Sequence, residues 1–241
     1  MSRSGPLVIL VGGEPVPGVL ATRGGFADLI EGAAREAWSG RWNRVDLRDG
    51  SPLPSPGDIA GVVVTGSASS VTERAPWMLR VEEYLRMLVR ERVLTFGICF
   101  GHQLLGQALG GSVARNPRGR EIGTVDLEIL ASDPILDGVV APLRANTTHV
   151  DTVDVLPPGA TVLARTRLEP HAAVRFAETA WGVQFHPEID AEVMRGYLTA
   201  RREVLAEEGI DADALLASAD DAVAGRATLR RFAEIVRDAG R

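Results

Sequence analysis

The hydrophobic pattern of the first 110 residues alternates between short strand-like runs and longer stretches with helical spacing. The stretch 26–38 repeats its apolar positions every three to four residues, and Pro76 opens a second stretch of this kind. Apolar runs without polar interruption are typical of parallel strands covered on both faces. The strand-like runs lie at residues 6–11, 44–47, 59–66 and 93–98. We therefore predict an α/β fold, a doubly wound and largely parallel sheet flanked by helices.

From residue 111 to residue 186 the pattern changes to short alternating or apolar runs between turns, which predicts a small antiparallel strand region. These runs lie at residues 123–130, 161–164, 172–176 and 180–185. Residues 190–238 return to helical spacing, and Asp211 is expected to cap a helix that begins just after it. We expect residues 1–190 to form one domain and residues 191–241 a C-terminal helical extension packed on it.

The composition is that of a globular protein and excludes several chemistries. Of the 241 residues, 45% are hydrophobic and 24% charged, and the net charge of −6 gives no sign of nucleic-acid or anionic-membrane binding. All 26 basic residues are arginine. A P-loop and a pyridoxal phosphate site both need a lysine, so both are excluded. The arginine clusters read as solvated faces: Arg115, Arg118 and Arg120, and Arg201 and Arg202.

The single cysteine excludes an internal disulfide, which fits a reducing compartment. The apolar run near the N-terminus, residues 6–11, is short for a secretory signal and far short of a membrane span. We expect a cytoplasmic protein without a membrane partner.

The single cysteine, Cys99, stands between two glycines in the sequence G-I-C-F-G, where a predicted strand runs into a predicted helix. Small residues at Gly97 and Gly101 let strand and helix approach, so that the turn projects its side chain as a nucleophile elbow does. The helix N-terminus lowers the pKa of such a thiol, and the amide of Phe100 would serve as an oxyanion donor. The alternative is a buried cysteine that acts as a small hydrophobic side chain.

A thiol nucleophile needs a base, and His186 is the best candidate among four histidines. It ends an apolar run, and a strand end brings its side chain to the rim of the sheet, while Glu188 could orient the imidazole. A surface histidine in a proline turn is the alternative. His102 follows Cys99 along the helix and is the less favoured base. His149 is expected to shape a substrate pocket, and His171 to be structural.

Together, "GICFGHQLLGQALGG" and "WGVQFHPE" resemble the motifs of the class I, triad-type glutamine amidotransferases over about residues 6–190. The resemblance implies a flavodoxin-like glutaminase domain without a cofactor or metal. It implies that Cys99 attacks the side-chain amide of glutamine, that His186 transfers the proton to ammonia, and that Glu188 holds His186. A γ-glutamyl thioester would form, and water would release glutamate.

The resemblance also extends to substrate and oxyanion positions. Gln103 matches a substrate-binding position, Asp151 a weaker one, and Gly66 an oxyanion donor in the loop "TGSASSV". Two residues depart from the family loop: Ser67 replaces a glycine and Ala68 replaces a proline. This form of the loop also resembles the γ-glutamyl peptidase branch of the superfamily, so γ-glutamyl peptides or conjugates are an alternative substrate.

Family synthetases join the glutaminase to a domain that consumes ammonia, and the helical residues after 190 cannot be that domain. The resemblance therefore implies a synthetase subunit on a separate chain, or simple hydrolysis of a γ-glutamyl small molecule. A homo-oligomer remains open too, as does a partner-dependent or inactive binding subunit. The pairs His149-x-Asp151 and His186-x-Glu188 could supply metal ligands, but the glycine-framed thiol favours the triad.

Overall fold

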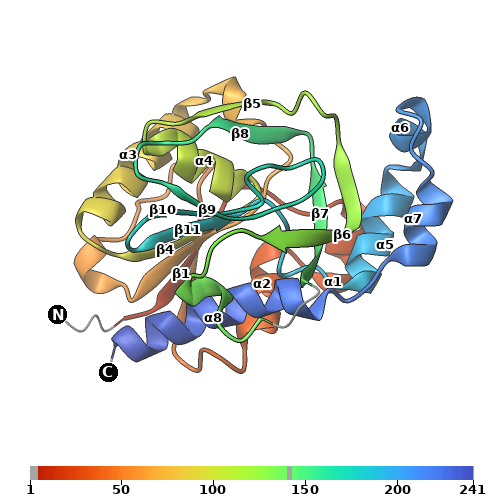
Figure 1. Ribbon diagram of the computed structural model, residues 1–241. Coiled ribbons are helices and arrows are strands. Elements are labelled where there is room, and N and C mark those ends of the chain that lie inside the picture. Colours follow the sequence, from red (N-terminus) through yellow and green to blue (C-terminus); the bar gives the residue numbers. More distant parts are fainter. Residues whose placement is uncertain (1–4, 140–142, 241) are drawn as a thin grey trace.

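A nine-stranded mixed sheet forms the centre of the computed structural model, which describes residues 5–139 and 143–240 (Figure 1). The strand order is β2-β1-β3-β4-β11-β10-β9-β6-β7. The first five strands in this order are parallel: β2 (Trp42–Asp46), β1 (Leu7–Val11), β3 (Gly61–Val64), β4 (Leu94–Ile98) and β11 (Ala180–Val183). The other four continue the sheet in antiparallel pairing: β10 (Ala173–Ala177), β9 (Thr161–Arg165), β6 (Glu121–Ile129) and β7 (Leu143–His149). A separate antiparallel pair consists of β5 (Ser112–Arg115) and β8 (Asp151–Val155).

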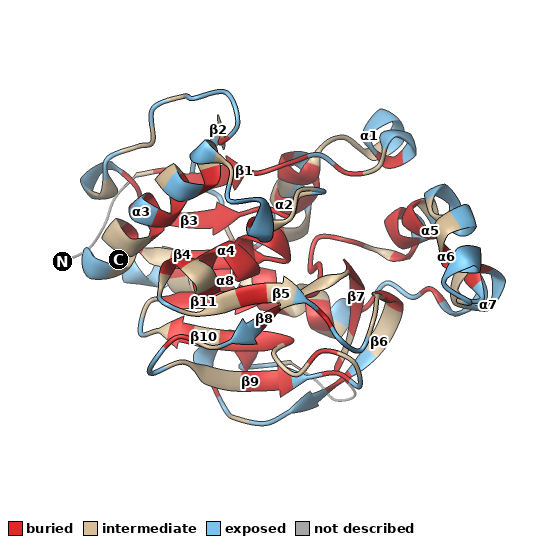
Figure 2. Ribbon diagram, turned by 90° about the horizontal axis from the view of Figure 1, so that it is seen from above, coloured by how far each residue is buried: buried red, intermediate tan, exposed pale blue. Residues whose placement is uncertain are grey.

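Helices cover both faces of the parallel strands (Figure 1). On one face, α3 (Pro76–Arg90) and α4 (Phe100–Ala108) pack on Val8, Val62 and Val64. On the other, α2 (Phe26–Ala34) and α8 (Val223–Ala239) pack on Leu7 and Phe96. Figure 2 shows the parallel strands largely buried between these layers. The strands β1, β3, β4 and β11 are buried on both faces, which explains why the sequence shows unbroken apolar runs there.

The remaining helices gather at one end of the sheet, beside β6 and β7 (Figure 1). They are α1 (Pro17–Arg23), α5 (Ala191–Ala200), α6 (Arg202–Glu207) and α7 (Ala212–Ser218). Three short 3₁₀ helices lie elsewhere in the connections: η1 (Pro56–Asp58), η2 (Val71–Glu73) and η3 (Pro134–Leu136). The Asp211 carboxylate accepts hydrogen bonds from the amides of Asp213 and Ala214, which confirms the predicted cap. No helix in residues 5–139 and 143–240 is long and apolar enough to cross a membrane.

The predicted architecture is confirmed, with local differences. The helix predicted over 26–38 ends at Ala34, and the strand predicted over 180–185 ends at Val183. The elements α1, β5, β7 and β8 were not predicted, nor were the 3₁₀ helices η1, η2 and η3. The sequence of β7, LRANTTH, is mostly polar, but every residue of the strand except Arg144 is buried. The Asn146 amide donates to the carbonyls of Ile189 and Asp220. The predicted division of the chain at residue 190 stays a prediction.

Candidate active site

The carboxyl ends of four parallel strands meet at one edge of the sheet. Gly12 follows β1, Gly66 follows β3 closely, Cys99 follows β4, and His186 lies three residues after β11. In doubly wound folds, ligands bind at this edge because loops rather than side chains of the sheet line it. The fold therefore brings the predicted nucleophile and the predicted base to one place.

Cys99 occupies a strained turn between β4 and α4. Its backbone angles are φ 49° and ψ −101°, and its amide donates to the carbonyl of Val183 at 2.8 Å. A Cβ added to Gly97 would lie 2.5 Å from the Gly101 carbonyl oxygen. A Cβ added to Gly101 would lie 2.4 Å from the Val64 carbonyl oxygen. Both approaches confirm that the two glycines let strand and helix close on the elbow.

Gly101→Ala should therefore destabilise the protein by about 2–3 kcal/mol, because a backbone atom rather than a flexible side chain must move. Gly32→Ala is the matched control: Gly32 lies in α2 with no atom within 4 Å of its added Cβ. That variant should gain about 0.5–1 kcal/mol from helix propensity. Urea unfolding of both variants measures the difference, and equal stabilities would contradict the close-approach argument.

His186 and Glu188 form a buried pair beside the thiol. The ring Nδ1 of His186 lies 2.7 Å from Glu188 Oε1, and the two residues are only 3% and 2% exposed. The Phe26 ring stacks on the imidazole with centroids 5.9 Å apart. Gly66 leaves room for the same ring, since an added Cβ would lie 2.9 Å from its Cε1 atom. The imidazole is thus fixed on three sides.

Cys99 and His186 shift one another's protonation. Burial alone would lower the pKa of His186, but the charges of Glu188 and Cys99 raise it to about 10. Burial alone would raise the pKa of the Cys99 thiol, but the charge and hydrogen bond of His186 lower it below its usual value. Both shifts favour the thiolate and imidazolium form of the pair, which is the reactive form of a cysteine nucleophile.

Two glutamines form a hydrogen-bonded chain that ends at the Cys99 sulfur. The Nε2 group of Gln184 donates to Cys99 Sγ at 3.4 Å. Gln103 Nε2 donates to Gln184 Oε1 at 3.0 Å and to the carbonyl of Asp151 at 2.9 Å. Gln184 was not among the predicted site residues, although it precedes His186 by two positions in the quoted motif.

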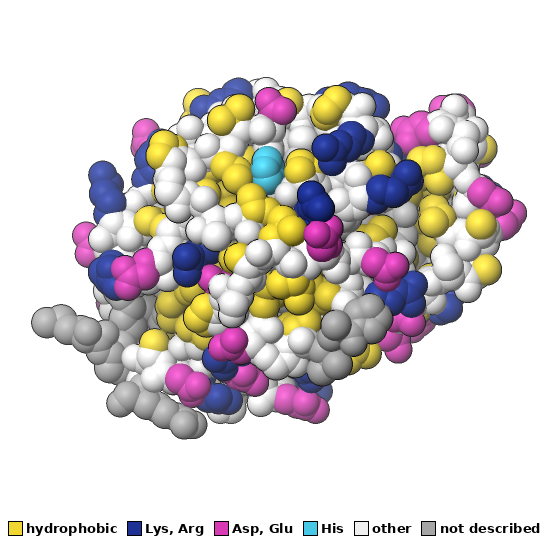
Figure 3. Space-filling model, viewed as in Figure 1, with side chains coloured by type: hydrophobic (Ala, Val, Ile, Leu, Met, Phe, Trp, Pro, Cys, Tyr) yellow, Lys and Arg dark blue, Asp and Glu magenta, His cyan; other side chains and the backbone are white. Residues whose placement is uncertain are grey.

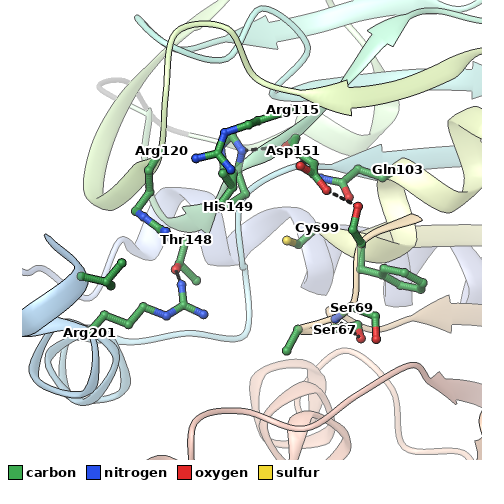
Figure 4. Close-up of a pocket in the computed structure, with 15 residues that line it drawn as sticks. Ser67, Ser69, Cys99, Gln103, Arg115, Arg120, Thr148, His149, Asp151 and Arg201 are labelled. Atoms are coloured by element: carbon green, nitrogen blue, oxygen red, sulfur yellow. Dashed lines mark hydrogen bonds between the residues drawn. The ribbon is translucent and has the colours of Figure 1, made fainter. Parts of the chain in front are cut away.

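Two cavities open on Cys99. The first has a volume of about 400 Å³, and Figure 4 shows it between Gln103 and Asp151 on one side and Arg120, Arg201 and Thr148 on the other. The second, about 220 Å³, lies on the side of His186. The two cavities share five residues of their walls, namely Ser67, Ala68, Cys99, Thr148 and Arg201. The thiol is therefore reachable from two directions although its residue is only 6% exposed.

Three of the arginines that were expected on solvated faces line the first cavity. Arg115 and Arg120 come from β5 and the connection to β6, and Arg201 lies between α5 and α6. On the face in Figure 3, arginine side chains gather beside the β5–β6 connection and the C-terminal helices. Arg115 is exposed, as expected, but Arg120 and Arg201 are partly buried because the helices α5–α7 fold back over the carboxyl edge of the sheet. Sequence spacing alone does not show such a contact.

Residues 48–202 of the chain match the glutamine amidotransferase class-I family. The match covers Cys99, His186 and Glu188 as well as both substrate candidates. The chain belongs to this family.

Relatives of this class I amidotransferase include the glutamine-hydrolyzing GMP synthase of Aeropyrum pernix, 40% identical over 54% of this chain and 24% of the relative. One subunit of the glutamine-hydrolyzing GMP synthase of Pyrococcus abyssi is 44% identical over 39% of this chain and 50% of that protein. The chain thus spans a quarter to a half of these relatives. A crystal structure of a glutamine amidotransferase from Thermotoga maritima superposes with a TM-score of 0.76 at 26% identity, over 96% of this chain and all of the other.

In this class I amidotransferase, the altered loop after β3 makes bonds of its own. The Ser67 hydroxyl accepts from the amide of Ser69 at 3.1 Å. Thr65 Oγ1 accepts from the Gly12 amide and donates to the Gly66 carbonyl, both at 2.9 Å. The serine that replaces the family glycine therefore closes the turn through its side chain. The Phe100 amide is the first N–H of α4, so it has no acceptor within that helix.

The two predicted substrate residues of the amidotransferase line the first cavity, but both already form hydrogen bonds within the protein. The amide nitrogen of Gln103 serves the network beneath the thiolate. The Asp151 carboxylate accepts from the Ser70 hydroxyl at 2.5 Å and is half-buried on the cavity wall. Gln103 thus positions Gln184, and Asp151 offers a negative charge to the cavity.

The other three histidines of the amidotransferase do not occupy the place beside Cys99 that His186 fills. His102 is fully buried against the Phe176 ring, and burial lowers its pKa to about 3, so it stays neutral. His149 lines the first cavity, as expected, between Glu121 and Glu169. Burial opposes its charge, but these carboxylates raise its pKa. His171 bonds the carbonyl of Val153 at 2.6 Å. In the described ranges, no three His, Cys, Asp or Glu residues are grouped as metal ligands.

Proposed function

We propose that this protein hydrolyses the side-chain amide of glutamine through a thioester on Cys99. One observation carries the proposal: a strained cysteine elbow faces a buried His186–Glu188 pair at the carboxyl edge of the sheet. Membership of the class I family supports it, and two relatives are named as glutamine-hydrolyzing enzymes.

In the proposed reaction, the Cys99 thiolate attacks the amide carbon, and the amides of Gly66 and Phe100 stabilise the oxyanion. The His186 imidazolium gives its proton to the departing nitrogen, so ammonia leaves and a γ-glutamyl thioester remains. Neutral His186 then takes a proton from water as the water oxygen attacks the thioester. Glutamate leaves and the thiolate and imidazolium are restored, while Glu188 keeps the ring in place.

We further propose that ammonia passes to an acceptor on a separate chain. The Pyrococcus abyssi relative is by name one subunit of a glutamine-hydrolyzing GMP synthase, and its similarity to this chain supports an arrangement of that kind.

A second candidate is hydrolysis of γ-glutamyl amides whose amine is larger than ammonia. The cavity of about 220 Å³ on the His186 side supports it, because the leaving group departs on the side of its proton donor. Its wall is mainly apolar, with Val16, Phe26 and Tyr197, and carries the carboxylate of Glu14. A cavity of this size could hold an amine side chain as well as ammonia.

Kinetic assays with matched substrates separate the two candidates. The first candidate predicts that kcat/KM for glutamine exceeds that for a γ-glutamyl dipeptide by about 10-fold or more. An α-glutamyl dipeptide, which places the amide on the other carboxyl, is the control and should not be hydrolysed. Faster turnover of the γ-glutamyl dipeptide would favour the second candidate. No turnover of either substrate, alone or with a synthetase chain, would leave only a binding role.

A further inference from the structure

Arg201 reaches the candidate active site from the C-terminal helices. It lies at the junction of α5 and α6, and its side chain forms part of the wall of both cavities that open on Cys99. Figure 4 shows the guanidinium directed toward the space between Thr148 and the cysteine. It donates a hydrogen bond to the Thr148 hydroxyl and lies over the Tyr197 ring, 5.2 Å from its centroid.

The charge of Arg201 is not balanced by a carboxylate within the described part of the chain. Its neighbours differ in this respect: Arg202 pairs with Asp213 at 2.8 Å, and Arg120 holds Glu208 with two bonds of 2.7 and 2.9 Å. Burial lowers the pKa of Arg201, so the guanidinium is held in a partly desolvated place. A cation in such a place is stabilised by an anion that binds beside it.

We propose that Arg201 binds the α-carboxylate of the γ-glutamyl substrate, an inference that rests on the proposed function. The amino-acid end of such a substrate carries one carboxylate and one ammonium group, a short chain away from the carbon that Cys99 attacks. The first cavity offers a matching pair of charges, with Arg201 on one wall and Asp151 on the other (Figure 4). Guanidinium groups suit this role because their planar donors can engage both oxygens of a carboxylate.

The first cavity, rather than the second, suits the acidic end of the substrate. Arg115 lines only the first cavity and adds positive charge there, whereas Glu14 lines only the second. An anion would therefore be attracted to the first cavity, with its reacting carbon directed to Cys99 and its leaving group toward His186.

Two reagents that alkylate the same thiol test the proposal. 6-Diazo-5-oxo-norleucine carries the amino-acid end of glutamine, and iodoacetamide lacks it. In Arg201→Gln, labelling of Cys99 by the norleucine reagent should slow by about 10- to 100-fold, the loss expected for a charged hydrogen bond. Labelling by iodoacetamide should change less than about threefold, because it uses no carboxylate contact. Arg202→Gln is the matched control and should behave as the unmodified protein with both reagents.

Steady-state kinetics add a readout that a structural role would not move. KM for glutamine should rise by about 10- to 100-fold in Arg201→Gln, with kcat changed far less, and Arg201→Lys should recover part of the loss. Glutamine without its α-carboxylate, γ-aminobutyramide, should react slowly with the unmodified protein and equally slowly with the variant. Equal slowing of both alkylating reagents, or a further loss with γ-aminobutyramide, would overturn the role of Arg201. Failure of the unmodified protein to react with the norleucine reagent while iodoacetamide labels it would instead overturn the proposed function.

Discussion

Cys99→Ala is expected to lower the rate of glutamine hydrolysis by about 10⁴-fold or more, because the proposed reaction has no other nucleophile. Cys99 is the only cysteine of the chain, and no second thiol can replace it. An assay of ammonia release measures the loss. Mass spectrometry after incubation with 6-diazo-5-oxo-norleucine should show a single adduct on Cys99 in the unmodified protein and none in the variant.

The Cys99→Ala variant should remain folded, which makes it informative. The turn at φ 49° is strained for cysteine and alanine alike, so the backbone cost is nearly unchanged. The loss of one buried sulfur should change the free energy of unfolding by only about 1 kcal/mol. Hydrolysis that persists near the original rate in the folded variant would exclude the thioester route.

The parallel half of the fold could be predicted from the sequence because its strands carry apolar side chains on both faces. Residues 6–11 show the reason: Leu7 to Leu10 are all fully buried, so every position of the strand must be apolar and the strand is visible as an apolar run. In β7 most of the buried side chains are polar, and Asn146 bonds to the carbonyls of Ile189 and Asp220, far along the chain. A polar strand of this kind has no apolar period to detect.

The reactive centre could be predicted because its chemistry is concentrated in two short motifs. Cys99 and the pair His186–Glu188 each stand at a strand end, and parallel strands bring such ends to one edge. Arg201 could not be found in the same way. Its neighbour Arg202 is exposed and ion-paired, so the double arginine looks like a solvated helix face. Arg201 and Arg202 differ in environment only because α5 and α6 fold back over the edge of the sheet, which the sequence does not show.

His186→Asn is expected to lower kcat/KM for glutamine by about 10²- to 10⁴-fold, since it removes both the proton donor and the charge that maintains the thiolate. His171→Asn is the control, because His171 bonds a backbone carbonyl away from the thiol, and its rate should stay within about threefold. A loss in both variants of the same size would point to unfolding rather than chemistry.

The pH dependence of the unmodified protein and its variants distinguishes the electrostatic role of His186 from a purely steric one. With the His186 pKa raised to about 10 and the Cys99 pKa lowered, hydrolysis should fall in acid as the thiolate gains a proton, and in base above about pH 10 as the imidazolium loses one. In His186→Asn, the iodoacetamide alkylation rate should rise with pH only near the ordinary thiol pKa of about 8.5 or above. Glu188→Gln removes the carboxylate that raises the His186 pKa, so its basic limb should move to lower pH while the acid limb changes less. If the pH dependence of iodoacetamide alkylation were the same in His186→Asn as in the unmodified protein, the charge of His186 would not be what lowers the pKa of Cys99.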